Sequence, residues 1–240
     1  LNKLVRDVSE AANEEDVGLA ILIDEAQDLT PDELTAVCSA AHVAGQQEWN
    51  CLFALAGLPS LPRVLAEAKS YSERLFVFEQ IGHLTEDLAR KALTEPAALE
   101  RVAWEENAVD FIVQQASGYP YFLQQFGQET WNASSDSPIG LPDARVGAAL
   151  GRDALDNGFF RARWDRATRA EKRYLRAMAV DGDAGSSSGD VATRLGRSVT
   201  SFGPTRASLI AKGLIFAPAH GVVAFTVPCM AEFIQRQADQ

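Results

Sequence analysis

Hydrophobic positions in the first third of the chain alternate between helical spacing and short continuous apolar runs. Apolar side chains repeating at helical spacing predict an amphipathic helix, whereas a short unbroken apolar run predicts a buried strand. The segments follow one another as helix 4–12, strand 19–23, helix 32–43, strand 51–56, helix 62–68 and strand 75–78. This alternation predicts a parallel α/β sheet covered by helices on both faces.

The strand signals stop after Leu84, and helical patterns cover residues 86–93, 107–116 and 121–131. Thr85, followed by Glu86 and Asp87, predicts a capped start for the first of these helices, because acidic groups interact favourably with the positive end of a helix dipole. A stretch rich in Ser, Pro, Gly and Asp at 134–142 predicts a linker or an exposed loop. The middle of the chain is therefore expected to be a small helical domain.

The last segment opens with Thr168 and Glu171 at the spacing of a capping box. A Gly/Ser-rich loop at 182–189 precedes helical patterns at 191–196 and 202–214, and two short apolar segments at 215–216 and 222–227 predict a hairpin. Three helices followed by a hairpin predict a winged helix-turn-helix. The expected fold class is thus α/β plus all-α, with domains at 1–82, 83–150 and 151–240.

Charge is distributed unevenly along the 240 residues, whose net charge is −11. Residues 1–150 hold 9 basic and 24 acidic residues, whereas residues 151–240 hold 13 basic and 9 acidic ones. This asymmetry favours separate domains with separate partners and argues against a general nucleic-acid or membrane binder. No apolar stretch approaches the roughly 20 residues of a membrane span, and the three Cys and three His residues lack metal-ligand spacing. We expect a cytoplasmic protein without a metal at those residues.

One motif carries the strongest chemical signal: the apolar run 19–23 is followed directly by Asp24 and Glu25. The carboxyl ends of strands are where α/β sheets bind ligands. A carboxylate there suits Mg²⁺, which prefers oxygen ligands and keeps part of its water shell. A neighbouring carboxylate can activate an attacking water. Helix capping after a core strand is the plainer interpretation of the same two residues.

This segment resembles a Walker B motif, and the order of elements along nearly the whole chain resembles the AAA+ and STAND ATPases, especially relatives of the origin-recognition ATPases. The resemblance implies that Asp24 helps to hold Mg²⁺ and that Glu25 orients the attacking water. It also implies that Arg74 reaches a neighbouring subunit's nucleotide, and that Gly118, Tyr119 and Pro120 form the nucleotide-sensing motif of the helical lid. An ordinary surface arginine and ordinary helix punctuation are the respective alternatives.

Two features depart from the family pattern. Residues 56–59 read Ala-Gly-Leu-Pro where a polar sensor residue is usual, and no G-x-x-x-x-G-K-[ST] phosphate-binding loop is present. Since the chain also opens without Met, we expect it to be the C-terminal part of a longer protein. ATP and Mg²⁺ are then cofactors of the full-length protein, and this chain alone is expected to bind neither and to be inactive as an ATPase.

The leading hypothesis is a regulatory ATP-binding protein that couples nucleotide state to a winged-helix interaction domain. The alternative is a DNA-binding winged-helix module in transcription or replication, without ATPase activity of its own. In that case polar residues in or before the second patterned helix contact double-stranded DNA, namely Thr200, Ser201, Thr205, Arg206 and Ser208. The plainer interpretation, that this domain packs on the lid or binds a protein, is favoured slightly, because residues 200–214 contain only two basic residues, Arg206 and Lys212. A helicase of the Asp-Glu-Ala-Gln type ranks low, because the second motor domain is missing.

A final expectation concerns the edges of the sheet. In the resembling families the strand that carries the phosphate-binding loop lies between those predicted here at 51–56 and 75–78. Without it, unpaired backbone groups would line both inner edges, and such edges are templates for pairing. We therefore expect the first 80 residues to be locally rearranged, or completed by self-association or by a second polypeptide.

Overall fold

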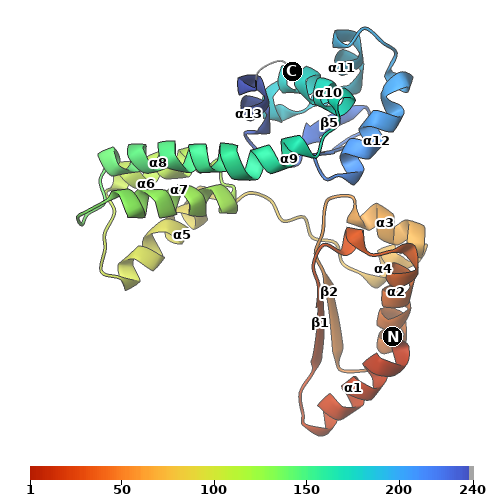
Figure 1. The fold of residues 1–240 in the computed structure, drawn as a ribbon. Coiled ribbons are helices and arrows are strands. Elements are labelled where there is room, and N and C mark those ends of the chain that lie inside the picture. Colours follow the sequence, from red (N-terminus) through yellow and green to blue (C-terminus); the bar gives the residue numbers. More distant parts are fainter. Residues whose placement is uncertain (238–240) are drawn as a thin grey trace. The chain divides into compact units, whose positions relative to one another are not determined.

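The computed structural model describes residues 1–237, which divide after Ile81 into two compact units, called unit 1 and unit 2 (Figure 1). Unit 1 contains α1 (Asn2–Glu14), β1 (Leu19–Ile23), η1 (Ala26–Asp28), α2 (Pro31–Gln46), β2 (Cys51–Leu55), α3 (Leu61–Ala68) and α4 (Ser72–Leu75). The strands β1 and β2 pair in parallel, with Leu19 opposite Cys51 and Ile23 opposite Leu55. Parallel pairing puts the carboxyl ends of both strands at one edge of the sheet.

The core of unit 1 lies between this sheet and its helices. Five buried side chains form it: Ala26, Leu34, Cys38, Leu61 and Leu65. The helix α2 starts at a complete capping box, in which Thr30 accepts from the Glu33 backbone N–H and the Glu33 side chain accepts from the Thr30 N–H. The first turn of α2 is thereby satisfied at the point where the chain leaves the sheet edge.

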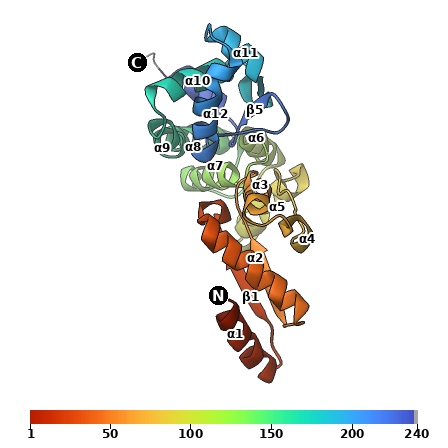
Figure 2. The ribbon, with the colours of Figure 1, turned by 90° about the vertical axis from the view of Figure 1, so that its right-hand side faces the viewer.

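Helices cover one face of the sheet, and the predicted cover on both faces is wrong for the described residues (Figures 1 and 2). Both strands alternate between half-buried and exposed side chains, and the exposed positions are Ala20, Leu22, Leu52 and Ala54. Leu22 is 75% exposed and Leu52 is 60% exposed. The apolar runs had indicated burial on both faces, but only α1 to α4 are present to provide it.

The predicted strand at 75–78 is also wrong. Residues 72–75 form the single-turn helix α4, and residues 76–85 have no regular structure. A groove of about 500 Å³ is lined by β2 residues together with Leu75 and Phe76, and Val77 is 88% exposed. A strand needs a hydrogen-bonded neighbour, and none is paired with this segment within residues 1–237. The expectation that the first 80 residues are locally rearranged, or completed by self-association or a second polypeptide, stays a prediction.

The first half of unit 2 is a bundle of four helices, α5 (Glu86–Leu99), α6 (Glu106–Ala116), α7 (Pro120–Ala133) and α8 (Leu141–Leu155). The sequence pattern did not reveal α8, because small residues make its buried face: Ala144, Gly147, Ala148 and Gly151. A Cβ at Gly147 would meet Thr130 at 2.2 Å, so α7 and α8 lie almost backbone to backbone. The absence of a side chain is what permits this contact.

A π-helical turn, η2 (Asp156–Phe160), continues α8 directly into α9 (Arg161–Asp165). The rest of unit 2 comprises α10 (Arg169–Ala179), η3 (Gly182–Ala184), β3 (Ser186–Ser187), α11 (Ser188–Arg194), η4 (Val199–Phe202), α12 (Gly203–Ala211), β4 (Ile215–Phe216), β5 (Val222–Phe225) and α13 (Met230–Arg236). The three strands form an antiparallel sheet in the order β3-β5-β4. The segment at 182–189, expected to be only a loop, supplies β3 and the first residues of α11, because Ser186 pairs with Val223.

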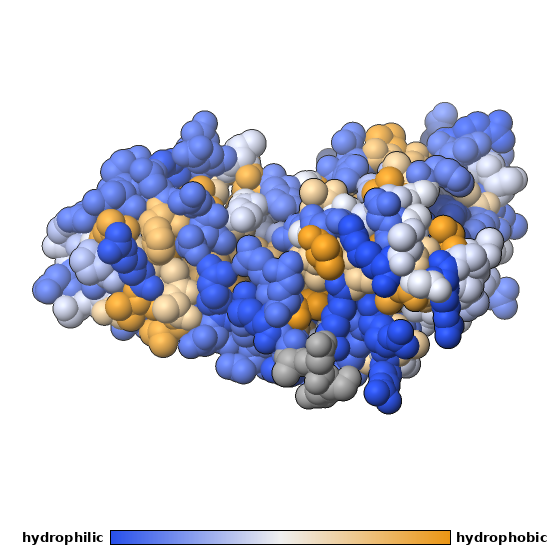
Figure 3. Space-filling view, turned by 90° about the horizontal axis from the view of Figure 1, so that it is seen from above, coloured by the Kyte–Doolittle hydropathy of each residue, from blue (hydrophilic) through white to orange (hydrophobic). Residues whose placement is uncertain are grey.

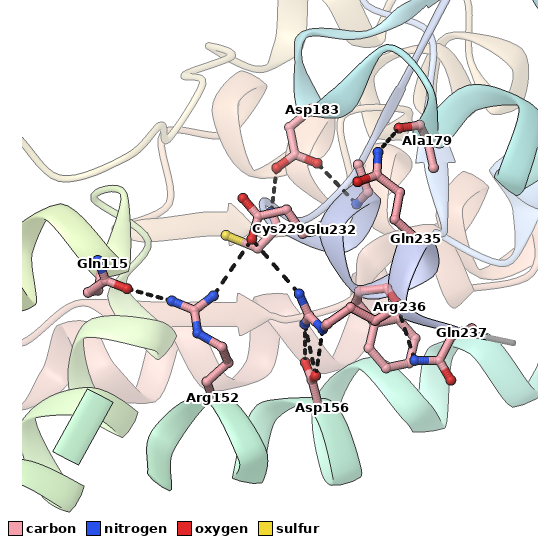
Figure 4. A network of polar contacts seen from close by, with 12 residues as sticks. Gln115, Arg152, Asp156, Ala179, Asp183, Cys229, Glu232, Gln235, Arg236 and Gln237 are labelled. Atoms are coloured by element: carbon pink, nitrogen blue, oxygen red, sulfur yellow. Dashed lines mark hydrogen bonds and ion pairs between the residues drawn. The ribbon is translucent and has the colours of Figure 1, made fainter. Parts of the chain in front are cut away.

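Ion pairs connect the two halves of unit 2 (Figure 4). Arg236 of α13 forms a bidentate ion pair with Asp156 of η2, with nitrogen–oxygen distances of 2.7 to 3.1 Å. Arg152 of α8 lies 3.6 Å from Glu232 of α13. Planar guanidinium–carboxylate pairs fix orientation as well as distance. The C-terminal helix is therefore tied to the end of α8.

Candidate functional site

Two adjacent carboxylates, Asp24 and Glu25, lie at the carboxyl end of β1, and both are exposed. Glu25 has a left-handed backbone conformation, with φ 48° and ψ 42°. Its N–H donates to Oδ1 of Asp24 at 2.9 Å. A non-glycine residue in this region stores strain of about 1 kcal/mol or more, and such strain concentrates at functional sites. The turn therefore orients the Glu25 side chain at an energetic cost.

Gln27 follows the two carboxylates in the Asp-Glu-Ala-Gln run, but the sequence analysis gave it no role at the site. Its side-chain amide donates to Oε2 of Glu25 at 2.5 Å, and its Oε1 accepts from the Leu58 backbone N–H at 3.0 Å. Gly57 makes room for it, since a Cβ at Gly57 would lie 2.4 Å from Gln27 Oε1. Gln27 thus supplies a polar side chain beside residues 56–59, where the sequence itself offers none. The glycine after β2 was the available signal.

The carboxylates suit a Mg²⁺ ion that is shared with phosphates. Protein-bound Mg²⁺ commonly uses one or two carboxylates and completes its octahedron with water and substrate phosphate oxygens. Asp24 and Glu25 provide that donor type, and within residues 1–237 no cluster of three or more His, Cys, Asp or Glu side chains offers an all-protein site. Asp24 and Glu25 therefore fit a Mg²⁺ ion that binds together with a phosphate-containing ligand.

Arg74 lies in α4 with its side chain exposed. Its neighbour Ser72 is buried, so the helical turn presents Arg74 outward while anchoring the segment. This orientation is compatible with a contact to another subunit and equally with an ordinary surface arginine. The role predicted for Arg74 stays a prediction.

Gly118, Tyr119 and Pro120 join α6 to α7. Gly118 has φ 70° and packs against residues 83–84, where a Cβ would lie 2.7 Å from the Leu84 carbonyl oxygen. Pro120 starts α7, and the Tyr119 ring lies edge-on to Phe122 with centroids 4.8 Å apart. This geometry explains the glycine and the proline by helix punctuation. A groove of about 550 Å³ nevertheless begins at Gly118 and is lined by α5 and α6 residues, including Arg90 and Asp110.

The five residues predicted to contact DNA lie in η4 and α12. Thr200 and Ser201 are exposed, whereas Thr205, Arg206 and Ser208 are half-buried. Arg206 lines a groove of about 630 Å³ together with Tyr174 and His220. The Ser208 hydroxyl instead donates to Oε1 of Glu171 at 2.7 Å. Of the five predicted residues, only Ser208 makes this hydrogen bond to Glu171.

Glu171 is the centre of a buried polar cluster and is only 4% exposed. Its carboxylate accepts from Lys212 Nζ at 2.7 Å and from the Thr168 N–H at 2.6 Å, in addition to Ser208. Burial by itself raises the pKa of Glu171, but the hydrogen bonds from Lys212, Ser208 and Thr168 outweigh it and lower the pKa to about 2. Glu171 is thus a structural carboxylate that joins α10 to α12.

The three cysteines, Cys38, Cys51 and Cys229, carry free thiols. Burial, reinforced by Glu232 and Asp183, raises the pKa of Cys229 to about 11. Burial also raises the pKa of Cys38 and of Cys51. A thiol reacts as its thiolate, so a raised pKa makes each of these cysteines less reactive than an ordinary free thiol at neutral pH.

Comparison with known proteins identifies the fold. The structure of the Walker-type ATPase PABY2304 of Pyrococcus abyssi aligns with 98% of this chain and 68% of its own length, at a TM-score of 0.65 and 16% identity. The structure of a mutant RuvB of Thermotoga maritima aligns with 87% of this chain and 68% of its own length, at a TM-score of 0.47 and 14% identity. Cdc6p of Pyrobaculum aerophilum aligns with 95% of this chain and 68% of its own length, at a TM-score of 0.40 and 14% identity.

A protein-family profile described as "Domain of unknown function (DUF8462)" matches residues 157–234. No curated protein sequence matches the chain significantly. The likeness to PABY2304 establishes a fold of the P-loop ATPase kind, mostly helical with a small parallel sheet. Within residues 1–237, no helix is both long and apolar enough to cross a bilayer.

Proposed function

We propose that this chain is the C-terminal part of an AAA+/STAND-type ATP-binding protein and couples nucleotide state to a winged-helix interaction domain. The observation that carries the proposal is the pair Asp24 and Glu25 at the carboxyl end of β1, within a fold of the P-loop ATPase kind. Gln27 supports it, because a hydrogen-bonded amide holds the second carboxylate in a strained turn. Capping alone would not need that strain.

In this proposal, Mg-ATP bound to the complete protein supplies the electrophilic phosphate and its charge-neutralising cation. Asp24 would hold the ion through its carboxylate. Glu25 accepts a proton from the attacking water through Oε1, since Gln27 already donates to Oε2. The exposed Arg74 contributes positive charge to the nucleotide of a neighbouring subunit, which makes self-association part of the mechanism.

In this proposal, unit 2 is the part of the chain that responds to the nucleotide state. We assign residues 83–150 to a helical lid and 151–240 to a winged helix built on α10, α11 and α12 with the sheet β3-β5-β4. The groove that begins at Gly118 is the proposed contact of the lid with nucleotide. The boundary falls inside α8, which runs through η2 into α9 without a break. A continuous helix, reinforced by the Arg236–Asp156 pair, is a stiff connection between the two.

The test compares binding and hydrolysis in the complete protein that contains a phosphate-binding loop. Glu25→Gln is expected to preserve nucleotide affinity and to slow hydrolysis by about 100-fold or more, since the proton acceptor is lost and the shape is kept. Glu48→Gln is the matched control, because Glu48 is also exposed and also has a positive φ, 53°. The control should hydrolyse ATP at the parent rate.

Equal hydrolysis rates for Glu25→Gln and the parent would remove Glu25 from the mechanism. The 240-residue chain alone should show no micromolar affinity for Mg-ATP in calorimetry, because it lacks the loop whose N–H groups hold the phosphates. Micromolar affinity would mean that the carboxylates belong to a different kind of nucleotide site.

A second candidate function is binding of double-stranded DNA by the winged helix without ATPase activity. The observation in its favour is the groove between α12 and the β4–β5 turn, where Arg206 lies near His220. An arginine there can read a base edge or hold a phosphate. Arg206→Ala should then weaken binding to a specific duplex more than to an unrelated one. An equal loss on both duplexes would exclude base reading by Arg206.

A further inference from the structure

Basic residues are concentrated in one short segment of a chain that is acidic overall. Seven of the 13 Lys and Arg residues after position 150 lie between 161 and 176, whereas only two acidic residues, Asp165 and Glu171, lie there. The segment corresponds to α9, the following turn and most of α10. In a protein of net charge −11, such a local excess needs an explanation of its own.

Helical geometry gathers four of these residues on one stripe. Arg169, Lys172, Arg173 and Arg176 of α10 have the spacing i, i+3, i+4, i+7, which places them on a single face of the helix. At 1.5 Å per residue, the stripe is about 10 Å long. Arg161 of α9 lines the same groove, whose volume is about 790 Å³. We call these five residues the α9–α10 basic groove.

The acidic residues of the segment do not neutralise this groove. Glu171 faces the opposite way, is 4% exposed and is held by Lys212 and Ser208 of or next to α12. Among the lining residues that the structure describes, Asp165 is the one acidic side chain, and its Oδ1 lies 3.8 Å from Lys172 Nζ. With Lys172 opposed by Asp165, the exposed Arg161, Arg169 and Arg173 give the groove about three positive charges.

Trp164 also lines the groove, and the packing of its indole ring indicates which kind of ligand the groove can bind. The indole is 4% exposed, with Lys172 at 5.1 Å and Arg176 at 5.4 Å from it in cation–π geometry. Two cations thus cover the aromatic ring and are held in place by it. An interface with a protein is expected to present an exposed aromatic or aliphatic anchor at its centre. Here the centre is covered by charge.

The chemistry of the lining favours phosphate groups. Four of the five basic residues are arginines, whose planar guanidinium donates two parallel hydrogen bonds to a phosphate. Arg161, Arg169 and Arg173 are exposed. Duplex DNA carries one negative charge per about 1.7 Å of axis, so a stripe of about 10 Å meets several phosphates at once. Hydrophilic side chains dominate the surface seen from above, with hydrophobic ones between them (Figure 3).

We propose that the α9–α10 basic groove binds the phosphate backbone of double-stranded DNA, independently of sequence and at a surface separate from the η4–α12 residues. The proposal uses residues of unit 2 alone and requires no nucleotide, so it stands or fails independently of the ATPase proposal. It also requires no base contact by Arg206. The groove positions the protein on DNA, because phosphate contacts set register and orientation without reading sequence.

The test measures binding of the 240-residue chain to a fluorescent duplex of about 20 base pairs and random sequence, by anisotropy, between about 50 and 200 mM salt. Neutralising about three phosphates gives a slope near −3 in a plot of log affinity against log salt. Arg169→Ala/Arg173→Ala should flatten that slope by about 2 and weaken binding by at least about tenfold at the lowest salt. Both positions are exposed, so the fold should survive, which circular dichroism checks.

The matched control is Lys91→Ala/Arg145→Ala, which removes the same charge from two exposed helical positions elsewhere in unit 2. The control should keep the parent slope. Arg169→Lys/Arg173→Lys should recover most of the slope, since charge is restored. If the control loses as much DNA affinity as Arg169→Ala/Arg173→Ala, the loss comes from the net charge alone, and the proposal is overturned. Absence of DNA binding at low salt would also overturn it, as would binding of polyglutamate in place of DNA, which would assign the groove to an acidic protein.

Discussion

The side-chain amide of Gln27 connects Glu25 to the loop after β2, donating to the carboxylate at 2.5 Å while accepting from the Leu58 N–H at 3.0 Å. One side chain thus spans the carboxyl ends of both strands. It also gives Gly57 a physical reason, because any larger residue would displace Gln27.

Replacing Gln27 should loosen this bridge. Gln27→Ala removes both hydrogen bonds and is expected to lower the free energy of unfolding of unit 1 by about 1 kcal/mol, as for a partly exposed pair of hydrogen bonds. Gln27→Glu should cost more, because a second carboxylate would face Glu25 and could not donate. Urea denaturation measures both. If Gln27→Glu is as stable as Gln27→Ala, the contact with Glu25 is not formed in solution.

Backbone strain at Glu25 predicts that glycine at this position stabilises the fold. Glu25→Gly should raise the free energy of unfolding by about 0.5 kcal/mol, since glycine adopts positive φ without a steric penalty. Part of the gain is offset by the lost hydrogen bond from Gln27. Glu48→Gly relieves a similar φ, 53°, and should gain somewhat more. A clear destabilisation by Glu25→Gly, with Glu48→Gly stabilising, would show that the bridge outweighs the strain.

The lowered pKa of Glu171 predicts a dependence of stability on acid. The folded pKa is about 2 and the ordinary value is 4.5, so the carboxylate stabilises the fold above pH 4.5 and that contribution is lost as pH falls from 4.5 towards 2. Glu171→Gln should lower the free energy of unfolding at about pH 7 by up to about 3 kcal/mol. The difference from the parent should shrink below pH 4.5. Glu95→Gln, exposed on α5, is the control and should show no such trend.

The uncovered face of the sheet predicts association. Leu22 and Leu52 are exposed on adjacent strands, and burying one leucine is worth about 1.5 to 3 kcal/mol. Light scattering should show a concentration-dependent increase in mass, and Leu22→Glu should weaken the association by about tenfold or more. Ile81→Glu, at a 95% exposed position outside the sheet, should leave it unchanged. A strictly monomeric parent at high concentration would refute this expectation.

Local sequence signals were sufficient for most helices and for two parallel strands. The capping box that the spacing of Thr168 and Glu171 predicts is present, because an N-cap depends on residues only three positions apart. The strand at 19–23 and the carboxylates after it are local features as well. By contrast, α8 was missed because its buried face is built from Gly and Ala, which carry almost no hydrophobic signal.

For the candidate site too, local features follow from the sequence, whereas contacts between distant residues do not. The sequence by itself determined that Asp24 and Glu25 follow an apolar strand, that no phosphate-binding loop is present among the 240 residues, and that positive charge accumulates after residue 160. Only the tertiary structure decided that Gln27 reaches Glu25 and Leu58, that Glu171 turns inward to Lys212, and that the apolar run 75–78 pairs with no strand among the described residues. Each of these outcomes depends on a neighbour distant in sequence or on the chain direction at a turn, and periodicity contains neither.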